Sequence, residues 1–354
     1  MKKLFLLLSF FLILPARAEV ISTTTTGTIE MASTTAYQDP TSTIFTTSTE
    51  TSGITTPIYE VKTDRELIVE PNIRVGLKKT KDVVNFVSEQ DYQIVSNDEI
   101  VATLPANEKA KISYKNGIYK FKSESLDLDS QTFWRLEPVE VGSIFNIPGC
   151  KISYTGRKIE YCGYRGTLEY RYSPKSKMPY LVNDLPLEDY MKGIAETDNN
   201  SAEGYIKAVL VAARSYAYKN ISSDPPTDKR LFDVYATTQD QLYLGYTSEQ
   251  KMPRVAQFAQ DTAGEMVTYD SNVVTTPYFS RTNGATKDWK NNAGENDRPW
   301  LVSVECVYDK GKRKSGHGYG MSTYDALMRA TKDGWGYVQL LEYYYTGTQV
   351  EKIY

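Results

Sequence analysis

A helix–loop–helix pattern constrains the fold of this chain more than any other stretch. It runs from residue 181 to residue 218 and reads LVNDLPLEDYMKGIAETDNNSAEGYIKAVLVAARSYAY. The pattern predicts a first helix that follows an N-cap at Asp184, carries Pro186 in its first turn and ends near Gly193. Proline is tolerated there because its missing N–H would have no partner within the helix. A short helix before a polar loop is therefore expected.

A longer helix is expected after this loop. Asn200 and Glu203 have the spacing of a capping box, which marks a helix start. The residues that follow form an apolar stripe at helical spacing, with alanines that let a neighbouring element pack closely. This stripe consists of Tyr205, Val209, Ala212, Ala213 and Tyr216. Glu196 lies in the loop between the two helices, and both helices could fix how deeply its carboxyl group is buried.

The composition is that of a globular protein. The chain has 354 residues, of which 40% are hydrophobic and 24% charged, and its net charge is −3. This length suffices for one large domain or two ordinary ones. A sequence pI of about 5.6 argues against nucleic acid as the main partner. The 28 tyrosines are expected mainly in strands and in the core.

The N-terminal residues predict export. Residues 1–18 have the charged start, apolar run and small residues of a secretory signal, with cleavage expected after Ala18. A retained N-terminal anchor is the alternative. Residues 19–57 are rich in Ser and Thr and predict a disordered tether or simple spacer. We therefore expect a location in the periplasm, in the cell wall or at the cell surface.

The remaining chain predicts an α+β fold. Short alternating or β-branched segments separated by Asn, Asp, Gly and Pro predict a β-rich N-terminal region over residues 58–148. Residues 149–354 are then expected to form a mixed α/β core with a substrate groove. No segment of the β-rich region has a catalytic pattern.

Cysteine spacing suggests one disulfide. Cys150 and Cys162 flank a hairpin pattern centred on Gly156, so a cross-strand disulfide is expected in an exported protein. Two reduced thiols are the alternative. Cys306 lies in a strand-like segment and is expected to be a buried thiol rather than a nucleophile paired with His317. Because the chain has a single histidine, a zinc site of His and Cys ligands is not expected.

A glycine-rich loop surrounds this histidine at residues 316–320. It lacks the lysine and spacing of a P-loop, and the strand–GxGxxG–helix context of a dinucleotide fold. Glycines on both sides of His317 fit either a backbone that passes close to a ligand or a tight structural turn.

Several motifs in register resemble the SpoIID/LytB family, which comprises stage II sporulation protein D and amidase-enhancer relatives. The resemblance covers about residues 164–354. The segments that carry it are YRGTLEY at 164–170, LVNDLPLEDYMKGIAE at 181–196, KAVLVAARSYAY at 207–218, QLYLG at 241–245, YFSRTNGATKDW at 278–289, PWLVSV at 299–304, GHGYGMSTYDAL from 316, and LLEYYYTGT at 340–348. It implies a SpoIID-like core and a lytic transglycosylase that cleaves peptidoglycan glycan strands, especially strands stripped of stem peptides.

The position of the catalytic acid is read from this resemblance. The family has a Glu followed by Met-Pro, whereas this chain has Thr197 and Asp198 after Glu196, and its spacing from Gly193 is two residues shorter. Counting from the glycine selects Asp198, and counting back from Arg214 selects Glu196. We favour Glu196 because the helix after the loop fixes the register, and we keep Asp198 as the reserve acid.

One acid suffices for transglycosylase chemistry, because the 6-hydroxyl of the sugar replaces the activated water of ordinary glycosidases. Glu196 should then be partly buried with a raised pKa. Arg214 or Arg281 is expected to pair with the lactyl carboxylate of a peptide-free muramic acid. The substrate-binding residues expected from the resemblance are Arg214, Tyr278, Ser280, Asn283, Gly284, Thr286, Trp289, His317, Gly318 and Ser322.

No cofactor is expected. Some family members bind zinc through Cys and His in a segment where this chain has Tyr235, Gln239 and Asp240, so no metal is predicted. The expected partners are peptidoglycan glycan strands, with a cell-wall amidase or another envelope protein as a further one.

Three alternatives remain open. The first is a non-catalytic peptidoglycan-binding amidase enhancer, which an exposed Glu196 without a groove would favour. The second is a structural surface protein that displays a β-rich head on its tether. The third is a hydrolase, which would need a second acid facing Glu196, with Asp198, Asp240 and Asp288 as the acids to inspect.

Overall fold

The computed structural model describes residues 69–148, 162–221, 231–290 and 297–354, together with the backbone of four short strands. These strands are β1 (Phe45–Thr47), β2 (Ile58–Glu60), β12 (Ile152–Tyr154) and β13 (Arg157–Ile159). The chain divides into two compact units, residues 1–63 and 64–354. The signal and tether predictions fall almost wholly outside the described residues.

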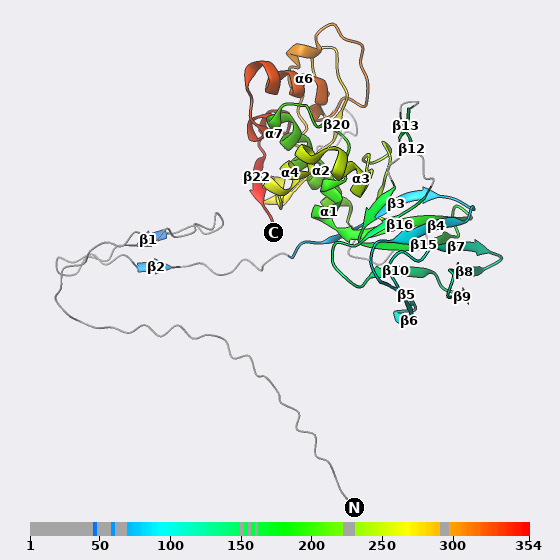
Figure 1. The fold of residues 1–354 in the computed structure, drawn as a ribbon. Helices are drawn as coiled ribbons and strands as arrows, with labels where there is room; N and C mark the ends of the chain where they lie inside the picture. Colours follow the sequence, from blue (N-terminus) through cyan, green and yellow to red (C-terminus); the bar gives the residue numbers. More distant parts are fainter. Residues whose placement is uncertain are drawn as a thin grey trace, which may run out of the picture. The chain divides into compact units, whose positions relative to one another are not determined.

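Two sheets build one side of the second unit, and the helices build the other (Figure 1). The larger sheet has the order β17-β3-β16-β15-β10-β5-β6, and the smaller one has the order β14-β11-β4-β7-β8-β9. All neighbours are antiparallel except β17 and β3. The bounds of the larger sheet are β3 (Asn72–Lys79), β5 (Tyr92–Ser96), β6 (Glu99–Leu104), β10 (Trp134–Pro138), β15 (Thr167–Ser173), β16 (Met178–Pro186) and β17 (Val234–Tyr235). Those of the smaller sheet are β4 (Val84–Ser88), β7 (Ala110–Lys115), β8 (Ile118–Lys122), β9 (Asp127–Ser130), β11 (Ile144–Asn146) and β14 (Gly163–Arg165).

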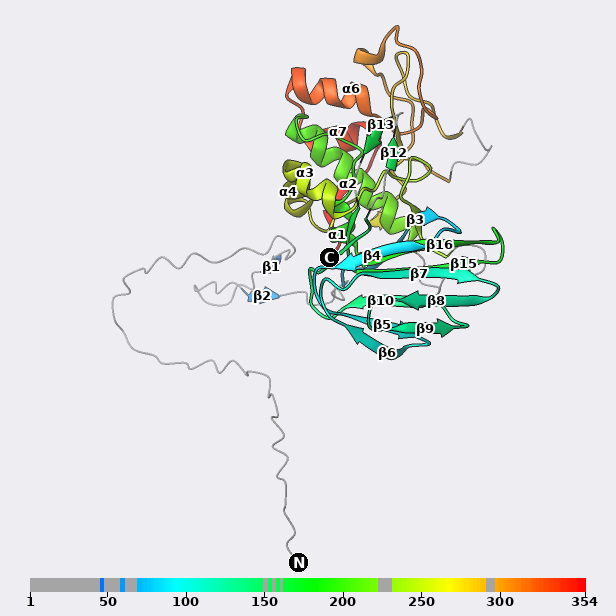
Figure 2. The same ribbon diagram turned by 45° about the vertical axis from the view of Figure 1, so that its right-hand side comes forward.

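Aromatic side chains fill the core of these sheets. Phe86 meets Tyr92, Phe121 and Phe145 edge to face, with ring centroids 5.9–6.2 Å apart, and Trp134 is buried in the same cluster. Alternating burial along β4 and β8 follows from the two-residue period of a strand. The α+β fold class is thus confirmed. Strands from either side of residues 148–149, where we expected a boundary, pair within both sheets, as Figure 2 shows.

The helix that precedes Glu196 begins differently from our prediction. β16 continues to Pro186, which is the N-cap of α1 (Leu187–Lys192), so Asp184 is a strand residue and not a cap. The first free N–H groups of α1 find other acceptors: Leu187 donates to the Pro71 carbonyl at 3.0 Å, and Glu188 donates to the Glu70 carboxylate at 2.7 Å. The segment before β3 therefore supplies the hydrogen-bond acceptors at the start of α1 that we had predicted for Asp184.

The capping box predicted for α2 (Glu203–Asn220) is also wrong. Its N-cap is Ala202, and no side chain caps the helix. Asp198 instead closes the turn ahead of the helix, since its carboxylate accepts from the Asn200 N–H at 2.9 Å and from the Ser201 hydroxyl at 3.1 Å. The helix itself is confirmed and is buried on nearly all sides from Tyr205 to Ala217.

The C-terminal part surrounds α2. It contains a second apolar cluster that includes Val209 and Ala212 of α2 and Leu340, Leu341 and Tyr344 of α7. Its elements are α3 (Tyr246–Lys251), α4 (Pro253–Asp261), β18 (Glu265–Tyr269), β19 (Asn272–Val273), β20 (Tyr278–Phe279), a 3-10 turn (Val307–Asp309), β21 (Met321–Ser322), α6 (Thr323–Met328), a π-helical turn (Arg329–Asp333), α7 (Tyr337–Tyr344) and β22 (Gln349–Lys352). Among the described residues, no helix is long and apolar enough to span a membrane.

The hairpin between the two cysteines is present with a shifted register. Ile152 faces Ile159 and Tyr154 faces Arg157, so the numbers of paired residues add up to 311 rather than to the 312 expected from Cys150 and Cys162. Cys150 lies outside the described residues, so its disulfide with Cys162 stays a prediction.

Candidate active site around Glu196

The loop that carries Glu196 is fixed by the segment Gln241–Gly245. The Ala195 N–H donates to the Leu242 carbonyl at 2.8 Å, and the Leu244 N–H donates to the Gly193 carbonyl at 2.9 Å. Ile194 and Tyr243 form an antiparallel bridge between these two contacts. The carboxylate itself accepts a hydrogen bond of 2.5 Å from the Leu242 N–H. Both the backbone and the side chain of the acid are therefore held by one neighbouring segment.

The surroundings of Glu196 favour its protonated form. The residue is half-buried, and burial raises the pKa of its carboxyl above the ordinary value, while the Leu242 N–H opposes this shift. The nearby charge of Glu196 adds to the raised pKa values of Tyr190, Tyr205 and Tyr278, whose main cause is burial. The acid thus lies among phenol groups in a poorly solvated place, as general-acid chemistry requires.

Gln241 links two of these tyrosines. The Tyr190 hydroxyl donates to Gln241 Oε1 at 2.9 Å, and Gln241 Nε2 donates to the Tyr278 hydroxyl at 3.2 Å and to the Ala213 carbonyl at 3.2 Å. Since the Tyr278 oxygen accepts this bond, its own proton is left to donate. Tyr190 and Gln241 were not among the predicted site residues. Gln241 belongs to the QLYLG motif and Tyr190 to the motif at 181–196; both motifs carried the family resemblance, but neither residue was given a role.

None of the three acids inspected as a second carboxylate contributes to the raised pKa of Glu196. Asp198 is exposed and caps the turn described above. Asp240 accepts from the Tyr216 hydroxyl and the Tyr235 N–H, both at 2.8 Å. Asp288 lies 3.5 Å from the Lys290 ammonium. Among the described residues, no carboxylate contributes to the raised pKa of Glu196. This arrangement suits chemistry with one acid.

Arg214 is not a groove residue, contrary to our prediction. Its side chain is fully buried and forms two hydrogen bonds with the Glu188 carboxylate at 2.9 and 2.8 Å. Its guanidinium also donates to the carbonyls of Ala259 and Glu265. These contacts join α1, α2 and α4 and leave no side for a substrate carboxylate. Arg214 therefore stabilises the fold.

Two other predicted groove residues are buried in loop contacts. The Ser322 hydroxyl donates to the buried Asp309 carboxylate at 2.6 Å, which also accepts from the Thr282 N–H. The Thr286 hydroxyl accepts from the Val304 N–H at 2.8 Å. The side chains of Ser322 and Thr286 thus support the loops, and the predicted direct contact with substrate is wrong for both.

The loop at His317 packs closely against β20. Gly316 and Gly318 have φ values of 102° and 92°, and a Cβ on Gly316 would lie 2.7 Å from the Phe279 Cβ. The His317 Nδ1 accepts from the Tyr319 N–H at 3.1 Å, so its Nε2 donates to the Tyr278 carbonyl at 3.0 Å. Burial lowers the pKa of this imidazole, which keeps it neutral. The tight turn that we considered is present, and His317 positions the backbone of Tyr278.

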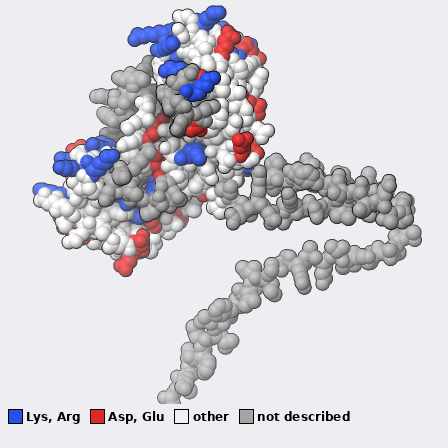
Figure 3. Space-filling view, turned by 180° about the vertical axis from the view of Figure 1, so that it is seen from behind, with Lys and Arg blue, Asp and Glu red and all other residues white. Residues whose placement is uncertain are grey.

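The remaining predicted residues lie near this loop. Trp289 meets Tyr319 edge to face at 5.0 Å, and its ring is covered by Arg298 at 4.2 Å. Ser280 and Asn283 are exposed. Gly284 accepts a backbone hydrogen bond of 2.7 Å from Cys306. Figure 3 shows Lys and Arg side chains at several separate places on one face. Exposed cations of this region are Arg281, Lys287, Lys310, Arg313 and Lys314.

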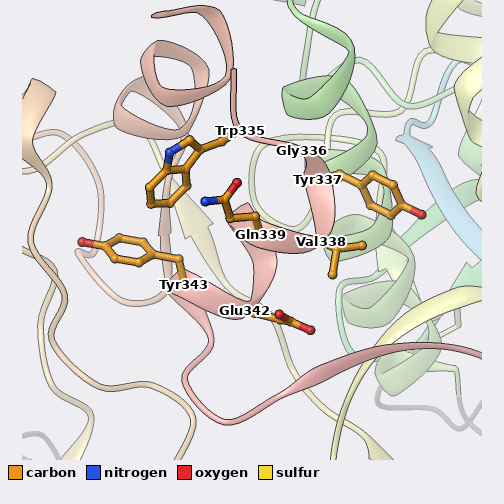
Figure 4. Close-up of a pocket in the computed structure, with 7 residues that line it drawn as sticks. All are labelled: Trp335, Gly336, Tyr337, Val338, Gln339, Glu342 and Tyr343. Carbon is orange, nitrogen blue, oxygen red and sulfur yellow. The ribbon is translucent and has the colours of Figure 1, made fainter. Parts of the chain in front are cut away.

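A hollow on α7 contains none of the predicted site residues. Trp335 and Tyr343 line one side of it, Tyr337 lies opposite, and Gln339 points between them (Figure 4). The Arg329 guanidinium lies over both the Trp335 and the Tyr343 rings, at 4.4 and 4.5 Å. Because this cation already covers ring faces, we assign the aromatic pair to the packing of α7.

The thiol and the zinc-like segment take no part in the site. Cys306 is buried, and burial raises its pKa to about 12, so the prediction of an unreactive buried thiol is confirmed. Tyr235 is the last residue of β17, and Gln239 and Asp240 lie in the turn that follows, where Asp240 accepts hydrogen bonds from the Tyr216 hydroxyl and the Tyr235 N–H. Neither Tyr235 nor Gln239 offers the soft donor that zinc prefers.

Comparison with known proteins agrees with this geometry. Residues 175–269 match the sequence model of the family SpoIID, described as Stage II sporulation protein. This part of the chain matches the SpoIID family. The matched range contains α1, Glu196, α2 and the Gln241 segment, and ends before the loops at residues 280–287 and 310–320.

Two curated relatives match part of the chain. An uncharacterized protein of Brachyspira hyodysenteriae (strain ATCC 49526 / WA1) is 33% identical over 153 residues, which are 43% of this chain and 39% of that protein. Stage II sporulation protein D of Bacillus subtilis (strain 168) is 25% identical over 145 residues, which are 36% of this chain and 41% of that protein. The chain thus spans about two fifths of the length of these relatives. SpoIID family membership indicates a role related to the cell wall.

Proposed function

We propose that this protein is a peptidoglycan lytic transglycosylase with Glu196 as its catalytic acid and base. The observation that carries the proposal is a half-buried carboxyl whose pKa is raised by burial and which has no partner carboxylate among the described residues. A glycosidase that activates water needs two carboxylates flanking the bond. One acid is enough when the nucleophile belongs to the sugar itself.

The proposed reaction balances without water. Protonated Glu196 donates its proton to the glycosidic oxygen as the bond to C1 of muramic acid breaks. The 6-hydroxyl of the same sugar attacks C1, and its proton passes to the Glu196 carboxylate. The products are a 1,6-anhydro-muramic end and a free 4-hydroxyl, and Glu196 is protonated again for the next cycle.

The rigid mounting of Glu196 supports this two-way proton transfer. The Leu242 N–H fixes one oxygen of the carboxylate, which leaves the other for the substrate. The Tyr278 hydroxyl, oriented by Gln241, has a proton to offer a sugar oxygen or the carboxylate. A secretory signal and a Ser/Thr-rich tether would place this activity outside the cytoplasm, where peptidoglycan lies.

The test uses the chain from Glu19 and its Glu196→Gln variant. Each is incubated with glycan strands stripped of stem peptides, and the products are read by mass spectrometry. We expect anhydro-muramic ends from the wild type and none from the variant, whose amide oxygen still accepts from the Leu242 N–H. Asp198→Asn is the matched control, because it changes the neighbouring exposed acid and should retain activity.

Other products would contradict the proposal in defined ways. Hydrated reducing ends would show hydrolysis and require a second carboxylate. Binding without cleavage by the wild type would favour the non-catalytic amidase-enhancer alternative. Cleavage lost in Asp198→Asn and kept in Glu196→Gln would transfer the role to the reserve acid.

A further inference from the structure

The hollow at α7 is a cavity that the proposed chemistry does not use. Its volume is about 630 Å³, within the range of about 300–1,000 Å³ that is usual for small-molecule sites. We call it the α7 hollow, and its lining residues are Trp335, Gly336, Tyr337, Val338, Gln339, Glu342 and Tyr343. None of these side chains belongs to the Glu196 site.

The backbone before α7 is distorted and so presents Trp335 to the hollow. α6 continues into the π-helical turn Arg329–Asp333, which ends at Gly334 with a φ of 72°. The Trp335 N–H then donates back to the Arg329 carbonyl at 3.3 Å. π-helical turns are rare and frequently occur at functional sites. The distortion is therefore a second feature, besides the cavity, that points to a binding site.

Buried contacts fix two aromatic rings of the α7 hollow. The Arg329 guanidinium lies over Trp335 and Tyr343 but does not line the hollow. Arg329 is itself held by the buried Asp325 carboxylate at 2.7 Å. The Tyr343 hydroxyl donates to the Glu305 carbonyl at 2.6 Å. This packing orients both rings without filling the hollow, and groups that are oriented in advance lose less entropy when a ligand binds.

Three polar groups of the α7 hollow lack a protein partner. Within the described part of the chain, the Trp335 indole N–H, the Gln339 amide and the Glu342 carboxylate form no hydrogen bond or ion pair. The indole can only donate, the carboxylate can only accept, and the amide can do both. Val338, whose side chain is 37% exposed, adds an apolar surface beside them.

This combination of groups matches an N-acetylhexosamine. The C–H groups of a pyranose ring pack favourably on the electron-rich faces of aromatic rings. The carbonyl of the acetamido group can accept from Trp335 or Gln339, its N–H can donate to Glu342, and its methyl group can contact Val338. An anionic ligand fits less well, because it would meet the Glu342 carboxylate.

We infer that the α7 hollow binds a neutral N-acetylhexosamine glycan at a site separate from the candidate active site. The first turn of α2 contacts both places. A Cβ on Gly204 would lie 2.5 Å from the Trp335 carbonyl oxygen, whereas the neighbouring Tyr205 is influenced by the charge of Glu196. The inference stands without the proposed reaction, because the hollow has no part in proton transfer. Where both hold, the hollow keeps the protein attached to a glycan while Glu196 acts on a strand.

The indole N–H signals of an isotope-labelled protein report on this site directly in NMR spectra. The chain has four tryptophans, and the Trp335 signal is the one that is lost in Trp335→Phe. The chain from Glu19 is titrated with chitotetraose, which consists of N-acetylglucosamine, and with cellotetraose, which has the same linkage but no acetamido group. We expect chitotetraose to shift the Trp335 signal and cellotetraose to bind at least about tenfold more weakly. The buried Trp134 should keep its signal in both titrations.

Two substitutions test the hollow in different ways. Gly336 has a φ of −76°, and no atom lies within 4 Å of the place where its Cβ would stand. Gly336→Leu therefore occupies the hollow without strain and should abolish the shift. Gln339→Leu removes only the amide and should weaken binding about tenfold, the usual effect of one lost hydrogen bond. Gln349→Leu replaces an exposed glutamine of β22 and is the matched control, which should bind like the wild type. Thermal unfolding shows whether each variant is folded.

Defined results would overturn the inference. They are an unmoved Trp335 signal at millimolar chitotetraose, equal affinity for the two tetrasaccharides, or full binding by a folded Gly336→Leu protein. A Trp335 signal that moves with a proline-rich peptide and not with chitotetraose would assign the hollow to protein docking instead. A shift confined to Trp289 would place the sugar in the candidate active site alone.

The two proposals fail separately. Glu196→Gln should retain the Trp335 shift, and Gln339→Leu should retain cleavage of short glycan strands. A wild type that does not cleave but shows the Trp335 shift refutes the transglycosylase and retains the glycan site. Normal cleavage with an unmoved Trp335 signal does the reverse.

Discussion

The Glu196 loop and the exposed basic run at residues 310–314 use charge in opposite ways. Glu196 is half-buried, bonded to the Leu242 N–H and surrounded by Tyr190, Tyr205 and Tyr278, so its pKa is raised. The cations of residues 310–314 lie on an exposed loop without ion pairs among the described residues. One region changes the protonation state of a single group, and the other gathers groups that stay charged.

This difference separates chemistry from recognition. Burial makes proton transfer sensitive to small changes of geometry, because the desolvated acid depends on a few fixed contacts. An exposed array is tolerant of geometry and sensitive to salt, because water and ions screen it. We therefore expect substitutions in the first region to change kcat, and substitutions in the second to change binding.

Replacement of Glu196 should have the largest effect. Glu196→Gln should lower kcat/KM by about 10²–10⁴-fold, the usual contribution of a general acid–base. In the wild type, kcat/KM should fall as the pH rises through the raised pKa of Glu196, because the protonated acid starts the reaction. A pH–rate profile measured with stripped strands tests this decrease in kcat/KM. A wild-type profile that rises through this range would contradict the assignment.

Arg214 and Arg281 give a direct test of buried against exposed charge. Arg214→Met leaves the half-buried Glu188 carboxylate without its cation and, among the described residues, bonded only to the Gly264 N–H and the Tyr354 hydroxyl, and should cost about 3–5 kcal/mol of stability. Arg281→Met should change stability by about 0.5 kcal/mol or less. Urea unfolding of the two variants provides the comparison. Similar stability of both would refute the structural role of Arg214.

Gln241 should affect the reaction without touching the substrate. Gln241→Leu removes the bonds to Tyr190 and Tyr278, so the Tyr278 hydroxyl loses its fixed orientation beside Glu196. We expect kcat to fall about tenfold, which is the effect of losing one hydrogen bond of about 1.4 kcal/mol. KM should change little, and the pH at which kcat/KM decreases should shift.

Gln239→Leu is the control for this variant, because Gln239 is exposed in the same segment. A purely structural role of Gln241 would lower the melting temperature and leave the pH profile of the folded fraction unchanged. That result would remove Gln241 from the site.

Local patterns allowed the fold class to be predicted, whereas the choice of Glu196 as the acid came from the family resemblance and stays a prediction. The periodicity of α2 and the alternation of the strands are properties of short segments, so they could be read directly. Choosing Glu196 over Asp198 relied on the register of the helix after the loop, and the structure places Glu196 in the phenol cluster and Asp198 on the surface. The start of α1 was missed because the acceptors for its first N–H groups, Pro71 and Glu70, come from another segment. The capping box of α2 was wrong although every residue concerned is local, since α2 begins after Ala202 without a side-chain cap.

The role of Arg214 could not be predicted because it depends on distant residues. Its partners lie on α1, α4 and β18, between 26 and 51 positions away in sequence. The same holds for Ser322, whose acceptor Asp309 is on another turn. A resemblance places such residues near a site but does not say whether their side chains face the substrate or the interior. Only tertiary packing decides this.

The smallest expected effect is a stability gain from the same substitution that abolishes activity. Because the pKa of Glu196 is raised by burial, the native protein keeps its proton to a higher pH than the unfolded chain. The stability of the wild type should then fall as the pH rises from the ordinary value of 4.5 through the raised pKa. Glu196→Gln has no such proton, so it should unfold at a slightly higher temperature near neutral pH, with the difference vanishing below 4.5.

Thermal unfolding of both proteins across this pH range measures the difference in unfolding temperature. The Arg313→Gln protein should show no comparable pH-dependent gain, since its charge is exposed. A difference that grows toward acid pH would mean that Glu196 is stabilised as a carboxylate, which would contradict both its raised pKa and its assigned role as the acid.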